Sequence, residues 1–149
     1  MRTKLRTRAA AAVVALLLGG LLALFATSGP AVAFFSGGLF LDVQVQSPAR
    51  LVARGAAVDV PLEVTCNTPE GAFVFVTVTQ HSGSGVAQGS RSTSVGCTGS
   101  GQQIVVRVSA SSGGKTFKQG TAVADAEIFG CRPGVCGTET DSEAITIQR

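Results

Sequence analysis

The sequence predicts an all-β protein: a single immunoglobulin-like sandwich of two sheets and about seven strands, which follows a cleaved signal peptide. Apolar residues recur at every second position in several segments, which is the period of a strand with one buried face. Turns rich in Gly, Ser and Pro separate these segments, as in small β-sandwiches. No segment after residue 33 shows the 3.6-residue apolar period of an amphipathic helix.

Residues 1–33 have the composition of an export signal. Four basic side chains lie in the first eight residues, an uncharged run of Ala, Val and Leu covers 9–25, and Ala31-Val32-Ala33 offers small side chains to a signal peptidase. We expect cleavage after Ala33 and a secreted, extracellular mature protein, residues 34–149, with no membrane association. An uncleaved membrane anchor is the alternative, because an apolar run of this length can span a bilayer.

The mature chain has no basic excess. Four of the twelve Lys and Arg lie in the signal segment, so residues 34–149 keep eight against nine Asp and Glu, a net charge near −1. A nucleic-acid partner is therefore not expected, because phosphate binding depends on clustered Lys and Arg. The 116 residues from 34 to 149 have the length of one domain.

The first two strands alternate regularly. Residues 39–46 form the first, and residues 50–54 are expected to continue its edge after Ser47-Pro48. Residues 58–66 form the second strand. Pro61 within it predicts an edge position or a bulge, because proline cannot donate a hydrogen bond to a neighbouring strand.

The third strand, residues 73–80, is apolar on both faces near its start. One face carries Val74, Val76 and Val78, and the other carries Phe73, Phe75, Thr77 and Thr79. Residues 82–94 are rich in Gly and Ser, which indicates a loop or a weak, short edge strand. Segments 102–110, 121–129 and 144–148 complete the predicted sandwich. Most of the phenylalanines after residue 33 are expected in the core; they are Phe34, Phe35, Phe40, Phe73, Phe75, Phe117 and Phe129.

Four cysteines in an exported chain with one histidine indicate disulfides rather than a metal site. Three pairings are open. In an immunoglobulin-like topology the end of 58–66 lies beside the start of 102–110, which favours Cys66 with Cys97. Cys131 and Cys136 enclose Pro133-Gly134, a pair typical of a type II turn, which favours the second bond.

Four short motifs carry a resemblance: Val64-x-Cys66, Val76-Thr77-Val78-Thr79-Gln80, Val95-Gly96-Cys97-Thr98-Gly99 and Phe117-x-x-Gly120-x-Ala122. They resemble small secreted bacterial β-sandwich proteins of unassigned function over residues 58–147. The size, fold and Cys131/Cys136 spacing also resemble the neocarzinostatin-type apoproteins of enediyne antibiotics, which implies a non-catalytic carrier with a ligand cleft. The chain departs from that family at Cys66 and Cys97, which enclose a longer loop, so no binding residue is carried over.

No catalytic or metal site is predicted, and no cofactor is expected. His81 is the only histidine and has Ser82 beside it, but adjacent residues lack the third group that orients a catalytic base. Glu139, Asp141 and Glu143 supply oxygen ligands of the kind that Ca²⁺ prefers, without the spacing of a known calcium loop. A solvated acidic loop is the favoured interpretation, and calcium binding stays open.

Two further segments invite a functional interpretation. The Gly-rich stretch 83–89 resembles a phosphate loop but precedes no helix, so we expect a flexible connection. Arg132, inside the short cysteine loop, is a candidate protease-inhibitor bait, although Pro133 follows it directly. A stapled turn is the favoured interpretation.

The leading functional hypothesis is a non-enzymatic secreted protein that binds a partner or contributes to the cell surface. The partner is expected to be a protein or a small apolar ligand. Because Val74, Val76 and Val78 match the core pattern, Phe73 and Phe75 are expected on the outer face as a binding surface. Cover by the mature N-terminal segment is the structural alternative. A small apolar-ligand carrier and a secreted hydrolase or protease inhibitor are the rival functions.

Overall fold

The computed structural model describes residues 38–149, which all belong to one compact unit. The signal peptide expected at 1–33 and the mature N-terminal residues 34–37 lie outside the described residues. The described chain folds into eight strands and one short 3-10 helix, in the order β1 (Leu41–Val45), β2 (Ala49–Val52), η1 (Ala53–Gly55), β3 (Ala57–Cys66), β4 (Ala72–Ser82), β5 (Gly85–Val95), β6 (Gln102–Ser109), β7 (Gly120–Arg132) and β8 (Val135–Gln148).

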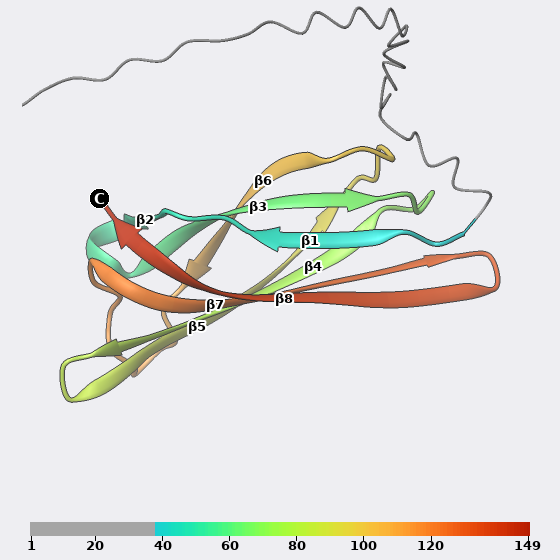
Figure 1. Ribbon diagram of the computed structural model, residues 1–149. Coiled ribbons are helices and arrows are strands. Elements are labelled where there is room, and N and C mark those ends of the chain that lie inside the picture. The colour runs from blue at the N-terminus through green and yellow to red at the C-terminus, as the bar shows by residue number, and fades with distance from the viewer. Residues whose placement is uncertain (1–37) are drawn as a thin grey trace, which may run out of the picture. The chain divides into compact units, whose positions relative to one another are not determined.

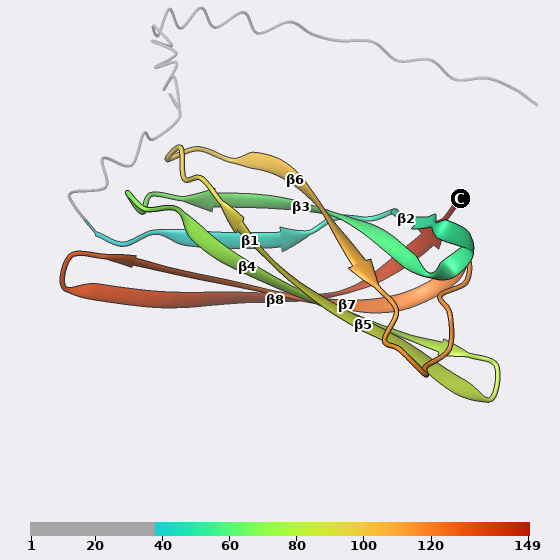
Figure 2. The same cartoon turned by 180° about the vertical axis from the view of Figure 1, so that it is seen from behind.

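The strands form two layers, which confirms the predicted all-β sandwich (Figures 1 and 2). In one layer β1 and β2 pair with one edge of β3, and β6 pairs with the other edge. In the other layer the strand order is β8-β7-β4-β5. Strand β2 also pairs in parallel with β8, so the two layers are joined along this side. The strand count is eight because the first predicted strand divides into β1 and β2 around Ser47-Pro48.

Small and medium apolar side chains from both layers fill the core. Alternate residues of β3 and β4 are fully buried, as the alternation predicted: Val58, Val60, Leu62, Val64, Val74, Val76 and Val78. Burying one such side chain contributes about 1.5–3 kcal/mol. Phe117 is 1 % exposed and closes the core beside η1, where its N–H donates to the carbonyl oxygen of Gly55 at 2.9 Å.

The edge position expected from Pro61 is wrong, because β3 is the central strand of its layer. The carbonyl oxygen of Pro61 accepts a hydrogen bond from Gln46 N–H at 2.9 Å. In an antiparallel strand the nitrogen and oxygen of one residue face the same neighbour. The missing N–H of Pro61 therefore faces Gln46, just past the end of β1, where the pairing of β3 with β1 ends and before its pairing with β2 begins.

Residues 82–94, expected to form a loop or a weak, short edge strand, do form an edge strand, but a long one. Strand β5 is eleven residues long and pairs with β4 along its whole length. Its inward residues include Ala87 and Gly89, which hide the usual apolar alternation. They are small because the end of β6 lies close to β5 (Figure 2), and a Cβ on Gly89 would lie 2.0 Å from the carbonyl oxygen of Ser109.

The last strand is longer than residues 144–148. Strand β8 begins at Val135 and follows β7 directly after the turn at Pro133-Gly134. The end of the β7–β8 hairpin extends past β1 (Figure 1), and the first half of β8 is largely exposed on both faces. The polar residues 137–143 therefore form a regular strand without an apolar alternation, which is why the sequence favoured a loop there.

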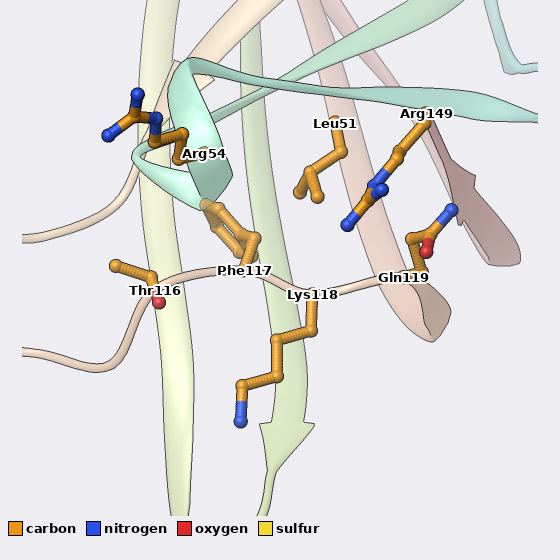
Figure 3. A pocket seen from close by; sticks show the side chains of 7 residues that line it. All are labelled: Leu51, Arg54, Thr116, Phe117, Lys118, Gln119 and Arg149. Carbon is orange, nitrogen blue, oxygen red and sulfur yellow. The ribbon is translucent and has the colours of Figure 1, made fainter.

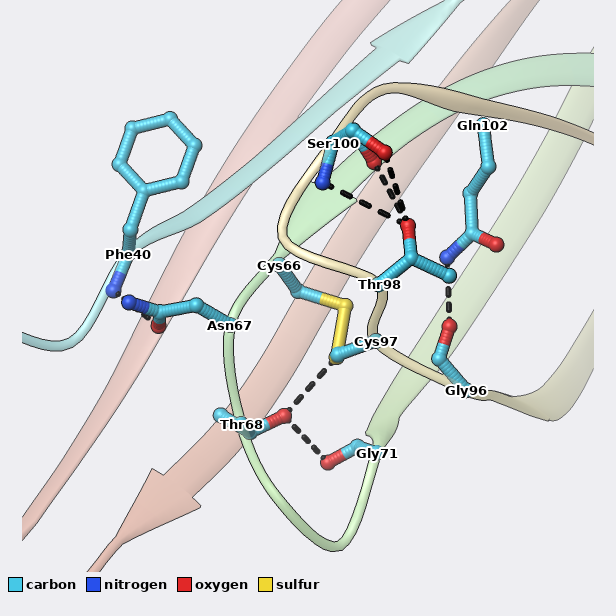
Figure 4. Close-up of a disulfide and its surroundings, with 10 residues drawn as sticks. All are labelled: Phe40, Cys66, Asn67, Thr68, Gly71, Gly96, Cys97, Thr98, Ser100 and Gln102. Carbon is cyan, nitrogen blue, oxygen red and sulfur yellow. Dashed lines mark hydrogen bonds between the residues drawn. A yellow bond between two sulfur atoms is a disulfide. The ribbon is translucent and has the colours of Figure 1, made fainter.

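Both expected disulfides are present in the structure. Cys66 at the end of β3 is bonded to Cys97, with 5.0 Å between the Cα atoms (Figure 4). Thr68 lies against this bond, since its hydroxyl is 2.9 Å from the Cys97 sulfur and donates to the carbonyl oxygen of Gly71 at 2.7 Å. Cys131 and Cys136 face each other across β7 and β8 and form the second bond, with 4.1 Å between Cα atoms.

Candidate binding surface

The outer face of the β8-β7-β4-β5 layer is the strongest candidate binding surface. Strand pairing places four residues from each strand side by side in four rows. We call this set the aromatic face, and from β5 to β8 its rows are Ser94-Phe73-Phe129-Thr138, Ser92-Phe75-Glu127-Thr140, Ser90-Thr77-Asp125-Ser142 and Gln88-Thr79-Val123-Ala144. None of these residues is buried, and none is Lys or Arg.

Three phenylalanines form the apolar centre of this face. Phe73 and Phe75, placed on the outer face by the alternation, are 61 % and 47 % exposed. Phe129, which the sequence did not single out, is 42 % exposed and lies directly opposite Phe73 on β7. Direct cross-strand neighbours have Cβ atoms about 4.5–5.5 Å apart, so these two rings are adjacent. The signal that places Phe129 outside was present, because buried Ala124, Ala126 and Ile128 precede it at alternate positions.

Two carboxylates lie next to the phenylalanines. Glu127 is directly opposite Phe75, and Asp125 follows in the next row, where its Oδ1 accepts a hydrogen bond from Ser142 Oγ at 2.6 Å. An open hollow of about 410 Å³ covers Phe75 and this pair. A second hollow of about 230 Å³ lies beside Phe73 and Phe129. The aromatic face thus joins exposed rings to negative charge without a cation among its residues.

His81 and Ser82 do not form a catalytic pair. They are consecutive residues of β4, so their side chains point to opposite faces of the sheet. His81 is exposed, while Ser82 is 6 % exposed and its hydroxyl has no hydrogen-bond partner within the described structure. The Gly-rich stretch at 83–89 is the hairpin turn and the first half of β5, with no helix after it among the described residues.

The acidic residues expected in a loop lie on β8 instead. Glu139, Asp141 and Glu143 alternate along one face of this strand, and Asp141 Oδ2 accepts a hydrogen bond from Val45 N–H at 2.7 Å. Asp141 therefore ties β1 to the projecting hairpin. Within residues 38–149 no group of three or more His, Cys, Asp or Glu side chains is arranged to hold a metal ion.

A basic hollow lies at the end of the sandwich that is farthest from the β7–β8 hairpin tip. Its volume is about 660 Å³, and its lining residues are Leu51, Arg54, Thr116, Phe117, Lys118, Gln119 and Arg149. Figure 3 shows Leu51 and Phe117 in its centre, with the three cationic groups spread around the rim rather than converging on one point. We call this surface the basic end. Arg132, the bait candidate, lies elsewhere and donates from Nη1 to the carbonyl oxygen of Gly38 at 2.9 Å.

The outer face of the other layer holds a buried carboxylate. Asp59 on β3 lies between Arg107 on β6 and Arg50 on β2, which both donate to it. The hydrogen bond from Arg107, opposed by burial and helped by Arg50, lowers the pKa of Asp59 to about 2. This cluster is structural, because its donors and acceptor satisfy one another across three strands.

No protein-family model matches this chain, and no curated protein matches it. Among solved structures the chain is similar to the major subunit of the aggregative adherence fimbriae type I from Escherichia coli. The two chains are 11 % identical, the match covers 74 % of this chain and 94 % of that chain, and the TM-score is 0.38. A likeness of this size supplies no argument about function. No helix within residues 38–149 is long and apolar enough to cross a membrane.

Proposed function

We propose that this chain is a non-catalytic, exported protein that binds a protein partner through its aromatic face. One observation carries the proposal: Phe73, Phe75 and Phe129 form a contiguous exposed cluster on β4 and β7, whose other face is buried. Apolar side chains scattered singly over a surface are ordinary, whereas a contiguous aromatic patch with a polar surround is typical of an interaction site. The Ser and Thr side chains around it supply such a surround.

A binding role accounts for the described residues better than catalysis does. His81 and Ser82 point to opposite faces, and the Asp59 carboxylate is held by two arginines on the other layer. A catalytic base needs a hydrogen-bond partner that is positioned against a substrate site. The aromatic face has exposed rings, two carboxylates and shallow hollows. These features suit the binding of a partner rather than the cleavage of a bond.

A small apolar-ligand carrier has weaker support. Ligand pockets bury most of the ligand surface in an apolar cleft. The hollows beside Phe73 and Phe75 are open, and the larger one is lined by Asp125 and Glu127. These features suit the side chains of a protein partner better than an apolar small molecule.

The double variant Phe73→Ser/Phe75→Ser tests whether the rings serve binding or stability. Exposed rings predict a loss of about 1 kcal/mol or less, since surface substitutions and cross-strand pairs contribute little. Rings that the N-terminal segment covered would cost about 3–5 kcal/mol each. A double variant that is unfolded or strongly destabilised in urea titration contradicts the proposal.

A photo-crosslinking residue at position 75 tests binding directly. It is introduced into the secreted protein and irradiated in culture medium, and the matched control carries it at Val105, which is 66 % exposed on the outer face of the other layer. We expect a discrete crosslinked protein with position 75 and none with position 105. Equal labelling at both positions, or none at position 75, contradicts the proposal.

A further inference from the structure

Two regions of the described chain gather charge of opposite sign. Five carboxylates lie on β7 and β8: Asp125, Glu127, Glu139, Asp141 and Glu143. The basic end carries Arg54, Lys118 and Arg149 and no Asp or Glu among its lining residues. These two regions therefore carry opposite charge, although the net charge of the described residues is small.

The aromatic face and the basic end are complementary in two respects. The face presents Phe75 and its neighbouring rings beside Asp125 and Glu127. The basic end presents a concave surface with Leu51 and Phe117 at its centre and cations on its rim (Figure 3). Rings that enter the hollow would meet Leu51, since Phe117 behind it is buried, and the two carboxylates would meet the rim.

We propose that the partner of the aromatic face is the basic end of a second copy of this chain. This inference rests on the proposed function and names its partner. A symmetric face-to-face dimer is disfavoured, because it would bring Asp125 and Glu127 of the two copies together, and like charges opposed across an interface are costly. The face-to-end contact is heterologous, so successive copies add in a row or a ring.

The spread of the cations supports a protein surface over a small anion as the occupant of the basic end. A bound phosphate or carboxylate is held by donors that converge on it. The charged groups of Arg54, Lys118 and Arg149 lie on different sides of the hollow instead (Figure 3). Cations that are spread in this way can each bind a different carboxylate of a broad protein surface.

The first test is the association state of the mature chain. Sedimentation velocity is measured from about 10 μM to about 1 mM, where contacts of modest affinity are populated. We expect assembly that is stronger at about 0.01 M salt than at about 0.15 M salt, since the screening length falls from about 30 Å to about 8 Å. A chain that stays monomeric over this whole range overturns the inference.

Charge reversal tests which surfaces meet. The face-reversed variant is Asp125→Lys/Glu127→Lys, and the end-reversed variant is Arg54→Glu/Lys118→Glu. Each variant alone carries two surfaces of like charge and is expected to be monomeric. In an equimolar mixture, the face of each variant meets an end of opposite charge on the other, so assembly is expected to return.

The control and the failures separate the two proposals. Asp42→Lys/Glu63→Lys changes the same amount of charge on the outer face of the other layer and is expected to assemble like the wild type. A mixture that stays monomeric, or a control that loses assembly, overturns the face-to-end contact. Crosslinking of a different protein at position 75 with a monomeric wild type refutes the second copy and leaves the proposed function standing. Unfolding of Phe73→Ser/Phe75→Ser refutes both.

Discussion

Arg107 holds the carboxylate of Asp59 with two hydrogen bonds, from Nε to Oδ1 at 2.7 Å and from Nη2 to Oδ2 at 3.0 Å. These residues are direct partners in the pairing of β3 with β6. Arg50, the partner of Asp59 on β2, donates to Oδ2 at 2.9 Å. One buried carboxylate thus links three strands of the layer, at the position where β2 pairs with both β3 and β8.

This link makes stability depend on pH in the acid range. The pKa of Asp59 is lowered from 3.8 to about 2, chiefly by the hydrogen bond from Arg107. A lowered pKa stabilises the folded state above the unfolded pKa, and the stabilisation is lost as the pH falls from about 4 through about 2. The loss is at most about 2 kcal/mol, because both arginines are largely exposed to water. Urea titration at pH 6, 4 and 2 measures it, and Asp59→Asn should show a smaller decline than the wild type. Identical declines would mean that Asp59 does not carry the effect.

The two disulfides should contribute unequally to stability. Cys66 and Cys97 are 31 positions apart and Cys131 and Cys136 are five apart. In the chain-entropy model the longer loop is worth about 4 kcal/mol and the shorter about 2 kcal/mol. We expect Cys66→Ser/Cys97→Ser to lower the free energy of unfolding more than Cys131→Ser/Cys136→Ser, as measured in urea. The reverse order would show that native packing at the hairpin tip outweighs loop closure.

Gly89 should tolerate no side chain. An added Cβ would lie 2.0 Å from the carbonyl oxygen of Ser109, a backbone atom that cannot rotate away. We expect Gly89→Ala to lower the free energy of unfolding by about 1–3 kcal/mol, the usual cost of overpacking. Gly96→Ala is the control, because nothing lies within 4 Å of its added Cβ, and its stability should be unchanged or slightly raised. Equal effects in the two variants would refute the close approach of β5 and β6.

Export should yield a mature chain that begins at Phe34. Ala31-Val32-Ala33 places small side chains where a signal peptidase requires them. Intact-mass measurement of the protein from culture supernatant should give the mass of residues 34–149 with both disulfides formed. A mass that includes residues 1–33 would show that the apolar segment is retained.

The sequence carries the core of this fold more clearly than its edges. Val74, Val76 and Val78 are buried as their alternation indicates, because packing against the second layer leaves water no access to them. Strand β5 was harder to recognise, because Gly89 is required by the close approach of Ser109 on β6. That approach is evident only in the folded chain. The first half of β8 has no buried face, so its sequence shows no alternation of apolar and polar residues.

The aromatic face was partly visible from the sequence. Phe73 and Phe75 follow from the alternation of β4 alone. The position of Phe129 beside them depends on the pairing of β4 with β7, which brings together residues 56 positions apart. Likewise, the basic end is formed by residues of β2 and η1, the 116–119 segment and Arg149. These residues are far apart in the sequence, so no local pattern predicts that they come together.

The parallel pairing of β2 with β8 also determines how the domain bears a stretching force. Gly38 lies near Arg132 at the β7–β8 tip, whereas Arg149 lies near Leu51 at the opposite end (Figure 1). Tension applied between these two points pulls β2 and β8 along their lengths in opposite directions. Their hydrogen bonds, which run across the strands, are then loaded in shear and must yield together rather than one after another. We expect this contact, formed by the pairs Ala49–Ile147 and Arg50–Gln148, to oppose extension of the domain along the axis between these two points.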